Sequence, residues 1–364
     1  MSNQIGKYLK LQLFGESHAF GLGVVIEGLP AGLAVDQQQI IKQLRARQSS
    51  FDFNTPRKEN DDFAFISGVY QDKTNGNPVA LIIYNKQQHS GDYDYYKRIM
   101  RSGHADYVAQ VKYEGYNDHR GGGIFSGRLT AAIVAGGAIA LSILQKKNIL
   151  IGSHIQQLQM LQDKYDPADL ASLLKQEHQD NFVVYDQDIR QQMLERIQFY
   201  SQDDDSLGAI VETNILNLPV GLGEPFFWGL EAALAQAIFS IPGIKALEFG
   251  DGFALVHKTG SQVNDSFYYD QQSQVKTRTN HLGGINGGIS NGMPLNFKTM
   301  VRPPASIAKL QHTIDLDSQK NITHIVKGRH DSFIANRTMV VIDNLSAFII
   351  LDLALSQFGK EWLK

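Results

Sequence analysis

Apolar side chains recur at three- and four-residue intervals in several segments, a spacing that predicts helices with one buried face. In residues 37–48, Ile40, Ile41 and Leu44 share such a face. Asp36 precedes them and can cap the helix, because its carboxylate accepts hydrogen bonds from the first turn. Similar spacing predicts further helices at Asp166–Gln176, Asp186–Tyr200, Glu224–Ile241 and Leu345–Phe358.

One segment is apolar on every side. Residues 129–144 read LTAAIVAGGAIALSIL and carry no charge. A membrane-spanning helix needs about 20 such residues, so the shorter length favours a buried core helix. Its glycines and alanines would let another element approach closely.

Short apolar runs bounded by turn residues predict strands. They fall at Val24–Glu27, Phe63–Ser67, Val79–Tyr84, Ala209–Ile215, Phe253–His257 and Met339–Ile342. Helices and strands are mixed without regular alternation. We therefore expect a layered α+β fold rather than a doubly wound parallel sheet.

A weak internal repeat relates two parts of the chain. Residues 25–33 and 215–222 each read as an apolar strand followed by a Leu-Pro turn and a helix. A duplication and a common strand–turn–helix solution are both open interpretations. We expect one domain over 1–364, with possible halves at about 1–150 and 206–364 and a polar, Gln-rich insert at 151–205.

Composition narrows the class of protein. The 364 residues are 43% hydrophobic and 20% charged, as is usual for a globular chain rather than a disordered one. There is no cysteine, which removes disulfides and thiolate sites and suits a cytoplasmic protein. The net charge of −3 argues against a general nucleic-acid or membrane-surface binder. The N-terminus has no pattern of a signal peptide, so none is expected.

Glycine, histidine, arginine and aspartate gather in a few segments of this weakly acidic chain. Glycine turns let backbone amides approach a ligand, and neighbouring arginines bind phosphate or carboxylate, so the pattern predicts a local anion pocket. The segments are Gly15–His18, Arg101–Asp106, Asp118–Arg128 and Lys327–Asp331.

Each of these motifs alone has a plain structural interpretation. His18 could be a structural hydrogen-bonding residue or a catalyst. His104 and Asp106, two residues apart, would face the same side of a strand and could simply bond each other. The glycines at 121–123 could cradle a phosphate or form a tight turn before the apolar helix.

Taken together and in order, the motifs resemble those of the chorismate synthase family, from about Ile5 to the last helix. They are Gly15–His18, Gly103–Asp106, Arg120–Gly123, Val220–Pro225, Gly250–Phe253, Gly260–Gln262, Gly283–Gly288 and Lys327–Asp331. The resemblance implies helices sandwiched between antiparallel sheets, with an internal pseudo-symmetric repeat, and a homotetramer.

The resemblance also implies a reaction. Chorismate synthases eliminate phosphate from 5-enolpyruvylshikimate 3-phosphate in a 1,4-anti sense to give chorismate, a step of aromatic amino-acid biosynthesis. They use reduced FMN without net redox change, so that the cofactor carries the hard chemistry and the protein supplies positioning and proton control. NADPH would serve as reductant.

By motif, His18, His104 and Asp331 match the family's proton-handling residues. Arg47 and Arg128 match arginines that face the substrate or, for Arg47, a nicotinamide cofactor. Flavin contacts are expected at Ile124, Phe125, Ser126, Pro242, Gly243, Gly287, Arg302, Pro303, Pro304, Ala305, Ser306 and Arg329. No metal is expected.

Several positions depart from the family pattern. Ile124 and Phe125 stand where an arginine and a serine are usual, and Phe53 stands where a second arginine is usual, with Arg57 as a possible replacement. Arg302 replaces a lysine. These changes bear on flavin and substrate affinity more than on the type of reaction.

Two other functions compete with this interpretation. The first is a metal-dependent phosphohydrolase, for which the ligands would be His104, Asp106, His119, His330 and Asp331. The second is a relative that binds flavin or phosphate but has lost turnover through the altered loop at 124–128. A chelator separates the first from a flavin enzyme.

Overall fold

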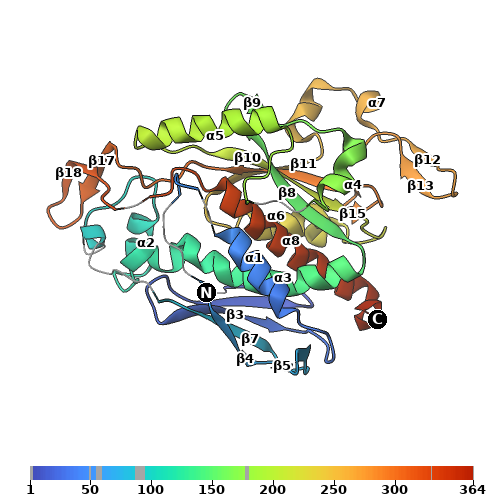
Figure 1. Ribbon diagram of the computed structural model, residues 1–364, viewed down its shortest axis with the longest axis horizontal. Coiled ribbons are helices and arrows are strands. Elements are labelled where there is room, and N and C mark those ends of the chain that lie inside the picture. The colour runs from blue at the N-terminus through green and yellow to red at the C-terminus, as the bar shows by residue number, and fades with distance from the viewer. Residues whose placement is uncertain are drawn as a thin grey trace.

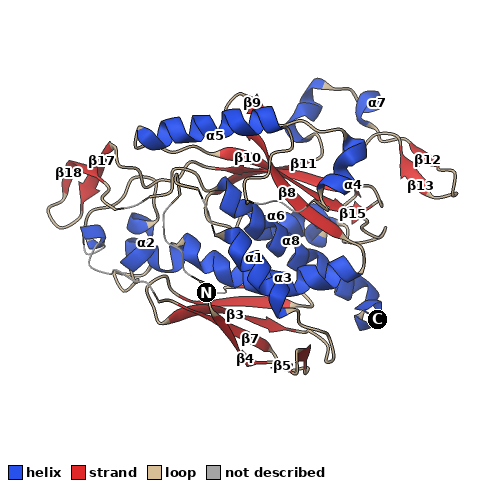
Figure 2. Ribbon diagram, viewed as in Figure 1, coloured by secondary structure: helices blue, strands red, loops and turns tan. Residues whose placement is uncertain are grey.

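Two five-stranded antiparallel sheets enclose a layer of helices (Figures 1 and 2). The computed structural model describes residues 3–48, 51–54, 60–86, 95–176, 180–328 and 330–363. The mixture of helices with antiparallel sheets confirms the α+β class.

The first sheet is built from the N-terminal part of the chain. Its strand order is β1-β2-β3-β7-β4, and alternate residues of β7 (Val79, Leu81 and Ile83) are buried while those between them are partly exposed. This period of two fits a sheet with one face against the core. The strands are β1 (Gln4–Ile5), β2 (Lys10–Gly15), β3 (Gly21–Glu27), β4 (Phe63–Ser67) and β7 (Val79–Tyr84).

The second sheet comes from the middle and later parts of the chain. Its order is β11-β16-β10-β8-β9, with antiparallel pairing throughout. The strands are β8 (Leu150–Leu158), β9 (Leu161–Gln162), β10 (Ala209–Leu216), β11 (Ile244–Phe249) and β16 (Leu295–Val301). Short hairpins pair β5 (Val69–Tyr70) with β6 (Lys73–Thr74), β12 (Phe267–Tyr269) with β13 (Val275–Thr277), β14 (Ile285–Asn286) with β15 (Ile289–Ser290), and β17 (Leu310–Asp315) with β18 (Lys320–Ile325).

The helix layer depends on small residues. In α3, a Cβ atom at Gly137 would lie 2.3 Å from the carbonyl oxygen of Asn344 in α8, so only glycine allows this crossing. Gly136 faces the first sheet instead, close to Leu11 and Val24. The layer contains α1 (Gln37–Arg47), α3 (Thr130–Lys146), α6 (Leu230–Ile238) and α8 (Ala335–Phe358). The shorter or outer helices are α2 (Asp106–Lys112), α4 (Leu170–Leu173), α5 (Gln187–Gln202) and α7 (Gly260–Val263).

The apolar run at 129–144 lies in the core, as predicted. Two helical segments, Gly127–Lys146 and Ala335–Phe358, are long and apolar enough to cross a membrane, but 89% and 94% of their apolar windows are buried inside the protein. Burial in the helix layer therefore accounts for their hydrophobicity.

The predicted cap of the first helix is confirmed, and a second helix that was predicted without a cap has the same one. Asp36 accepts a hydrogen bond from the backbone N–H of Gln39 at 3.0 Å and starts α1, and Asp186 does the same for α5 through Asp188 and Ile189. Helix Leu345–Phe358 is also present, but it starts earlier, at Ala335.

Two predicted strands are wrong. Met339–Ile342 belongs to α8, because a short apolar run fits a helix buried on all sides as well as a strand. Phe253–His257 lies in a 3₁₀ helix, Gly252–His257. The predicted helices at Glu224–Ile241 and Asp166–Gln176 are shorter than expected, because 3₁₀ turns at Phe226–Trp228 and Pro167–Asp169 replace their starts.

The segment 151–205 is not wholly an insert. Its first residues form β8 and β9 within the second sheet, because Ile155 and Leu158 contribute buried side chains. Helix α5 lies on the side of that sheet away from the helix layer (Figure 1).

The two Leu-Pro turns of the weak internal repeat each connect a strand to a helix, β3 to α1 and β10 to α6. The duplication itself stays a prediction.

Candidate active site

A cavity of about 1010 Å³ opens at the end of the helix layer. The C-terminus of α1 and the N-termini of α3 and α8 meet there, through Arg47, Thr130 and Arg337. Free N–H groups at a helix N-terminus favour anions. Of the predicted site residues, those that line this cavity are His18, Arg47, His104, Ile124, Phe125, Ser126, Arg128, Pro242, Gly243, Arg302, Pro303, Pro304, Ala305, Ser306 and Asp331.

The glycine run at 121–123 packs directly against His18. All three glycines have positive φ, of 59°, 83° and 54°, which favours glycine. A Cβ atom at Gly121 would lie 2.4 Å from the His18 ring, and the His18 side chain is almost wholly buried. The turn and His18 therefore pack as one unit, because the His18 ring occupies the space that a side chain at position 121 would fill.

His104 belongs to a compact ionic cluster. Its Nδ1 lies 2.6 Å from Asp106 Oδ1, and Arg101 contacts the same carboxylate through Nε and Nη2, both at 2.8 Å. Burial disfavours the charged Asp106, but its hydrogen bonds to Arg101 and His104 outweigh burial and hold the pKa of Asp106 far below its usual value. The expected contact exists, but a turn leading into α2 makes it, so the predicted strand geometry is wrong.

A buried carboxylate holds two arginines of the cavity wall. Asp61 contacts Arg47 Nη2 at 3.0 Å with Oδ2 and contacts Arg128 Nη1 with Oδ1. Burial disfavours the charged form of Asp61, but the two guanidinium groups hold its pKa below the usual value. Burial also lowers the pKa of Arg47 to about 10, well above neutrality, so the arginine stays charged.

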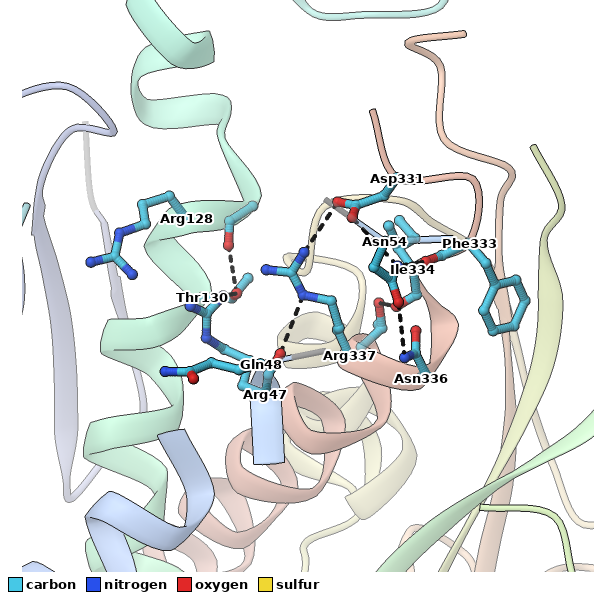
Figure 3. A network of polar contacts seen from close by, with 12 residues as sticks. Arg47, Gln48, Asn54, Arg128, Thr130, Asp331, Phe333, Ile334, Asn336 and Arg337 are labelled. Atoms are coloured by element: carbon cyan, nitrogen blue, oxygen red, sulfur yellow. Dashed lines mark hydrogen bonds and ion pairs between the residues drawn. The ribbon is translucent and has the colours of Figure 1, made fainter. Parts of the chain in front are cut away.

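Asp331 is held from two sides in Figure 3. Arg337 Nη1 lies 3.1 Å from its Oδ2, and Asn54 donates to its Oδ1 at 3.4 Å. Arg337 also donates from Nε to the backbone carbonyl of Arg47, at 3.2 Å. The network therefore joins the start of α8, the end of α1 and the segment around Asn54.

One wall of the cavity is rich in proline and glycine. Arg302 donates from Nη1 to the backbone carbonyl of Gly103 at 2.9 Å, and its own N–H bonds the carbonyl of Gly243. Arg302, which directly follows β16, thus connects this strand to the turn that carries His104. Pro303 and Pro304 continue this wall.

Comparison with known proteins shows to which family this chain belongs. The family model for chorismate synthase matches residues 9–355. The chain belongs to the chorismate synthase family. The enzyme of that name from Dehalococcoides mccartyi strain BAV1 is 41% identical over 356 residues, which cover 98% of this chain and 97% of that relative. The enzyme from Pyrococcus abyssi is 40% identical, with 98% of both chains covered.

A solved structure described as a crystal structure of chorismate synthase has the same fold. It aligns with a TM-score of 0.75 at 26% identity and covers 97% of this chain and 94% of its own. The sequence resemblance to the chorismate synthase family is therefore confirmed over nearly the whole chain.

Two predicted site residues are not placed in the cavity. Gly287 lies in the turn between β14 and β15, with φ of 61°, and does not line it. Arg329 lies outside the described residues, as does Arg57. Phe53, which replaces an arginine of the chorismate synthase pattern, packs in an aromatic cluster with Phe51 at 4.9 Å between ring centroids.

The sequence interpretation missed several residues of the site. Asp61 and Arg337 are the most important, and no local motif marks either of them. Tyr96 was also missed; its ring stacks under Arg101, 4.4 Å from the guanidinium carbon.

The phosphohydrolase alternative loses its support. Among the described residues, no three His, Asp or Glu side chains gather as a metal site. The carboxylates that suggested it are bound to arginines: Asp106 to Arg101 and Asp331 to Arg337. An arginine-bound carboxylate competes poorly as a metal ligand.

Proposed function

We propose that this protein converts 5-enolpyruvylshikimate 3-phosphate to chorismate by 1,4-anti elimination of phosphate. The observation that carries the proposal is the meeting of His18, His104 and Asp331 in one arginine-lined cavity. Membership of the chorismate synthase family supports it.

The substrate brings one phosphate and two carboxylates, and the cavity offers matching cations. Arg47, Arg128 and Arg302 line it, together with the N-termini of α3 and α8. Arginine suits such groups, because its planar fork donates two parallel hydrogen bonds to an oxyanion. We therefore assign Arg47 and Arg128 to the substrate side.

Reduced FMN is the proposed cofactor, and the cavity suits it in size and lining. Small-molecule pockets commonly measure about 300–1,000 Å³, so this one can hold a flavin beside a small substrate. Apolar and proline side chains offer surfaces against which a ring system can pack. They come from Ile124, Phe125, Pro242, Pro303 and Pro304, while Ser126, Gly243, Arg302, Ala305 and Ser306 add polar and backbone contacts. When bound, reduced FMN would lend electron density and take it back.

The three proton-handling residues have distinct settings. His104 bonds Asp106 through Nδ1, which leaves Nε2 as the nitrogen able to exchange a proton with a ligand. His18 is assigned to hold a proton beside the reduced flavin. Asp331, as a carboxylate fixed by Arg337 and Asn54, is assigned to proton removal.

The remaining assignments extend the same proposal. NADPH is the proposed reductant, with Arg47 assigned either to it or to the substrate. Arg329 is kept as a flavin contact, and Gly287, which does not line the cavity of this chain, is kept on the family resemblance alone. A cytoplasmic homotetramer is proposed, formed by one domain with pseudo-symmetric halves. Phe226 and Phe227 are both exposed, with ring centroids 6.5 Å apart, and such a pair of exposed aromatic side chains is consistent with self-assembly.

An anaerobic assay tests the function directly. The purified protein is mixed with reduced FMN and 5-enolpyruvylshikimate 3-phosphate, with and without EDTA, and chorismate and phosphate are measured. Equal amounts of both products, unaffected by EDTA, are expected. Phosphate release without chorismate would indicate a hydrolase. Substrate binding without either product would indicate an impaired relative.

A further inference from the structure

Arg337 occupies a bridging position at the edge of the cavity. Its Nε donates to the carbonyl of Arg47, and its Nη1 pairs with Asp331. The third nitrogen, Nη2, has no hydrogen-bond partner among the described residues. Figure 3 shows a guanidinium nitrogen of Arg337 pointing towards the side where Thr130 and Arg128 lie.

Cations outnumber carboxylates in the ion pairs that the described residues form at this corner. These pairs join three guanidinium groups, those of Arg47, Arg128 and Arg337, to two carboxylates, those of Asp61 and Asp331. The side chains of Arg47 and Arg128 are only 5% and 10% exposed, whereas that of Arg337 is 27% exposed and lines the cavity. Arg337 is therefore the most accessible of the three cations.

We propose that Arg337 both positions Asp331 and binds an oxyanion of the substrate through Nη2. The inference rests on the proposed function and adds a residue to it. Because one rigid, planar group makes all three contacts, an anion seated on Nη2 fixes the plane of the guanidinium. That plane in turn fixes Asp331. Binding of substrate and alignment of the carboxylate are then coupled through a single side chain.

The test compares Arg337→Gln with Arg190→Gln. Arg190 is a matched control outside the cavity: its Nη2 pairs with Asp180 at 2.6 Å, its Nε donates to the carbonyl of Phe182 at 3.3 Å, and its side chain is 24% exposed. Each substitution removes a guanidinium group that joins a carboxylate to a backbone carbonyl. Only Arg337→Gln should weaken binding of 5-enolpyruvylshikimate 3-phosphate, by about tenfold or more, in calorimetric titrations.

A double-mutant cycle tests the link to Asp331. Arg337→Gln should lower kcat by about tenfold or more in the wild-type background and by less than about twofold in Asp331→Asn, because residues that act through each other are not additive. Arg337→Lys keeps the charge but cannot bridge, so KM should recover while kcat stays low. This variant also decides the matter if Arg337→Gln does not fold.

The proposal is overturned if Arg337→Gln matches Arg190→Gln in affinity and turnover, if the losses in the cycle simply add, or if Arg337→Lys restores kcat. Failure of the wild type to form chorismate would instead overturn the proposed function. Titration with inorganic phosphate would then still decide the anion role of Arg337, and equal affinity in both Gln variants would refute it.

Discussion

Arg47 and Asp61 form an ion pair that is closed off from solvent. The atoms Nη2 and Oδ2 lie 3.0 Å apart, and the two side chains are only 5% and 0% exposed. The other oxygen of Asp61 holds Arg128, so one carboxylate sets the place of two arginines in the cavity wall. The proposed anion pocket thus depends on a residue that would not itself touch a ligand.

Replacing Asp61 should therefore destabilise the protein. In Asp61→Asn, two buried guanidinium groups lose their counter-charge, and the expected cost is about 3–5 kcal/mol in the free energy of unfolding, measured by urea denaturation. Asparagine tolerates the positive φ of 47° at this position, so the backbone is not the cause. The neighbouring pair of Asp62 with Lys86 is a control, because both side chains are half-exposed or more. Asp62→Asn should cost less than about 1 kcal/mol, and an equal cost for the two variants would contradict the role of Asp61.

The residues that we propose to handle protons should matter for turnover rather than for folding. His18→Ala and Asp331→Ala should each lower the rate of chorismate formation by about 100- to 10,000-fold, the usual contribution of a general acid or base. Circular dichroism and thermal melting would check that both remain folded. His257→Ala is the matched control, since His257 is exposed and lies outside the cavity. Wild-type rates in the two folded site variants would refute the assignment.

The altered loop should weaken the flavin site. Ile124 and Phe125 line the cavity, and neither side chain can donate a hydrogen bond. A charged hydrogen bond is worth about 1.5–3 kcal/mol, so Ile124→Arg with Phe125→Ser should tighten reduced FMN by about tenfold or more. Anaerobic titration with substrate present measures this.

Phe125→Ser alone is the control for the restored loop, because it removes the ring without adding a charge. We expect this single variant to gain much less affinity than the double variant. If the wild type already binds reduced FMN tightly and the double variant binds no better, other groups, such as Arg302 or the backbone amides of 121–123, have replaced the missing hydrogen-bond donors.

Asp343 should make stability depend on pH. Burial raises the pKa of its carboxyl to about 7, against the lowering effect of the hydrogen bond from Ser153 Oγ at 2.5 Å. In the unfolded chain the carboxyl loses its proton near pH 4, whereas the folded protein keeps it to about pH 7. The stabilising contribution is thus complete below pH 4 and is lost as the pH rises to 7.

Asp343→Asn removes this dependence, because an amide has no proton to lose. Relative to wild type, the variant should gain about 3–4 kcal/mol between pH 4 and pH 8, with no further change above pH 8. Urea denaturation at a series of pH values measures the difference. A difference that stays constant across the range would show that Asp343 titrates normally.

The sequence by itself determined the features that depend on residues close together in the chain, such as helix caps, and on the order of motifs along it, such as the family. Asp36 capped α1 as predicted, because capping needs only residues within one turn. The motif order indicated the family and the residues around His18, His104 and Asp331 that meet in the cavity. The run at Met339–Ile342 was misassigned, because local pattern cannot separate a short strand from a helix buried on all sides.

Only the tertiary structure decided which charges neutralise each other. Asn54 contacts Asp331 across 277 positions of sequence, and Arg128 meets Asp61 across 67. No local pattern specifies such pairs, because the helix layer and the two sheets must first bring the segments together. The anion pocket was visible as scattered arginines and glycines. Asp61 as their counter-charge, and Arg337 as the bridge to Asp331, exist only once α1, α3 and α8 meet at one end of that layer.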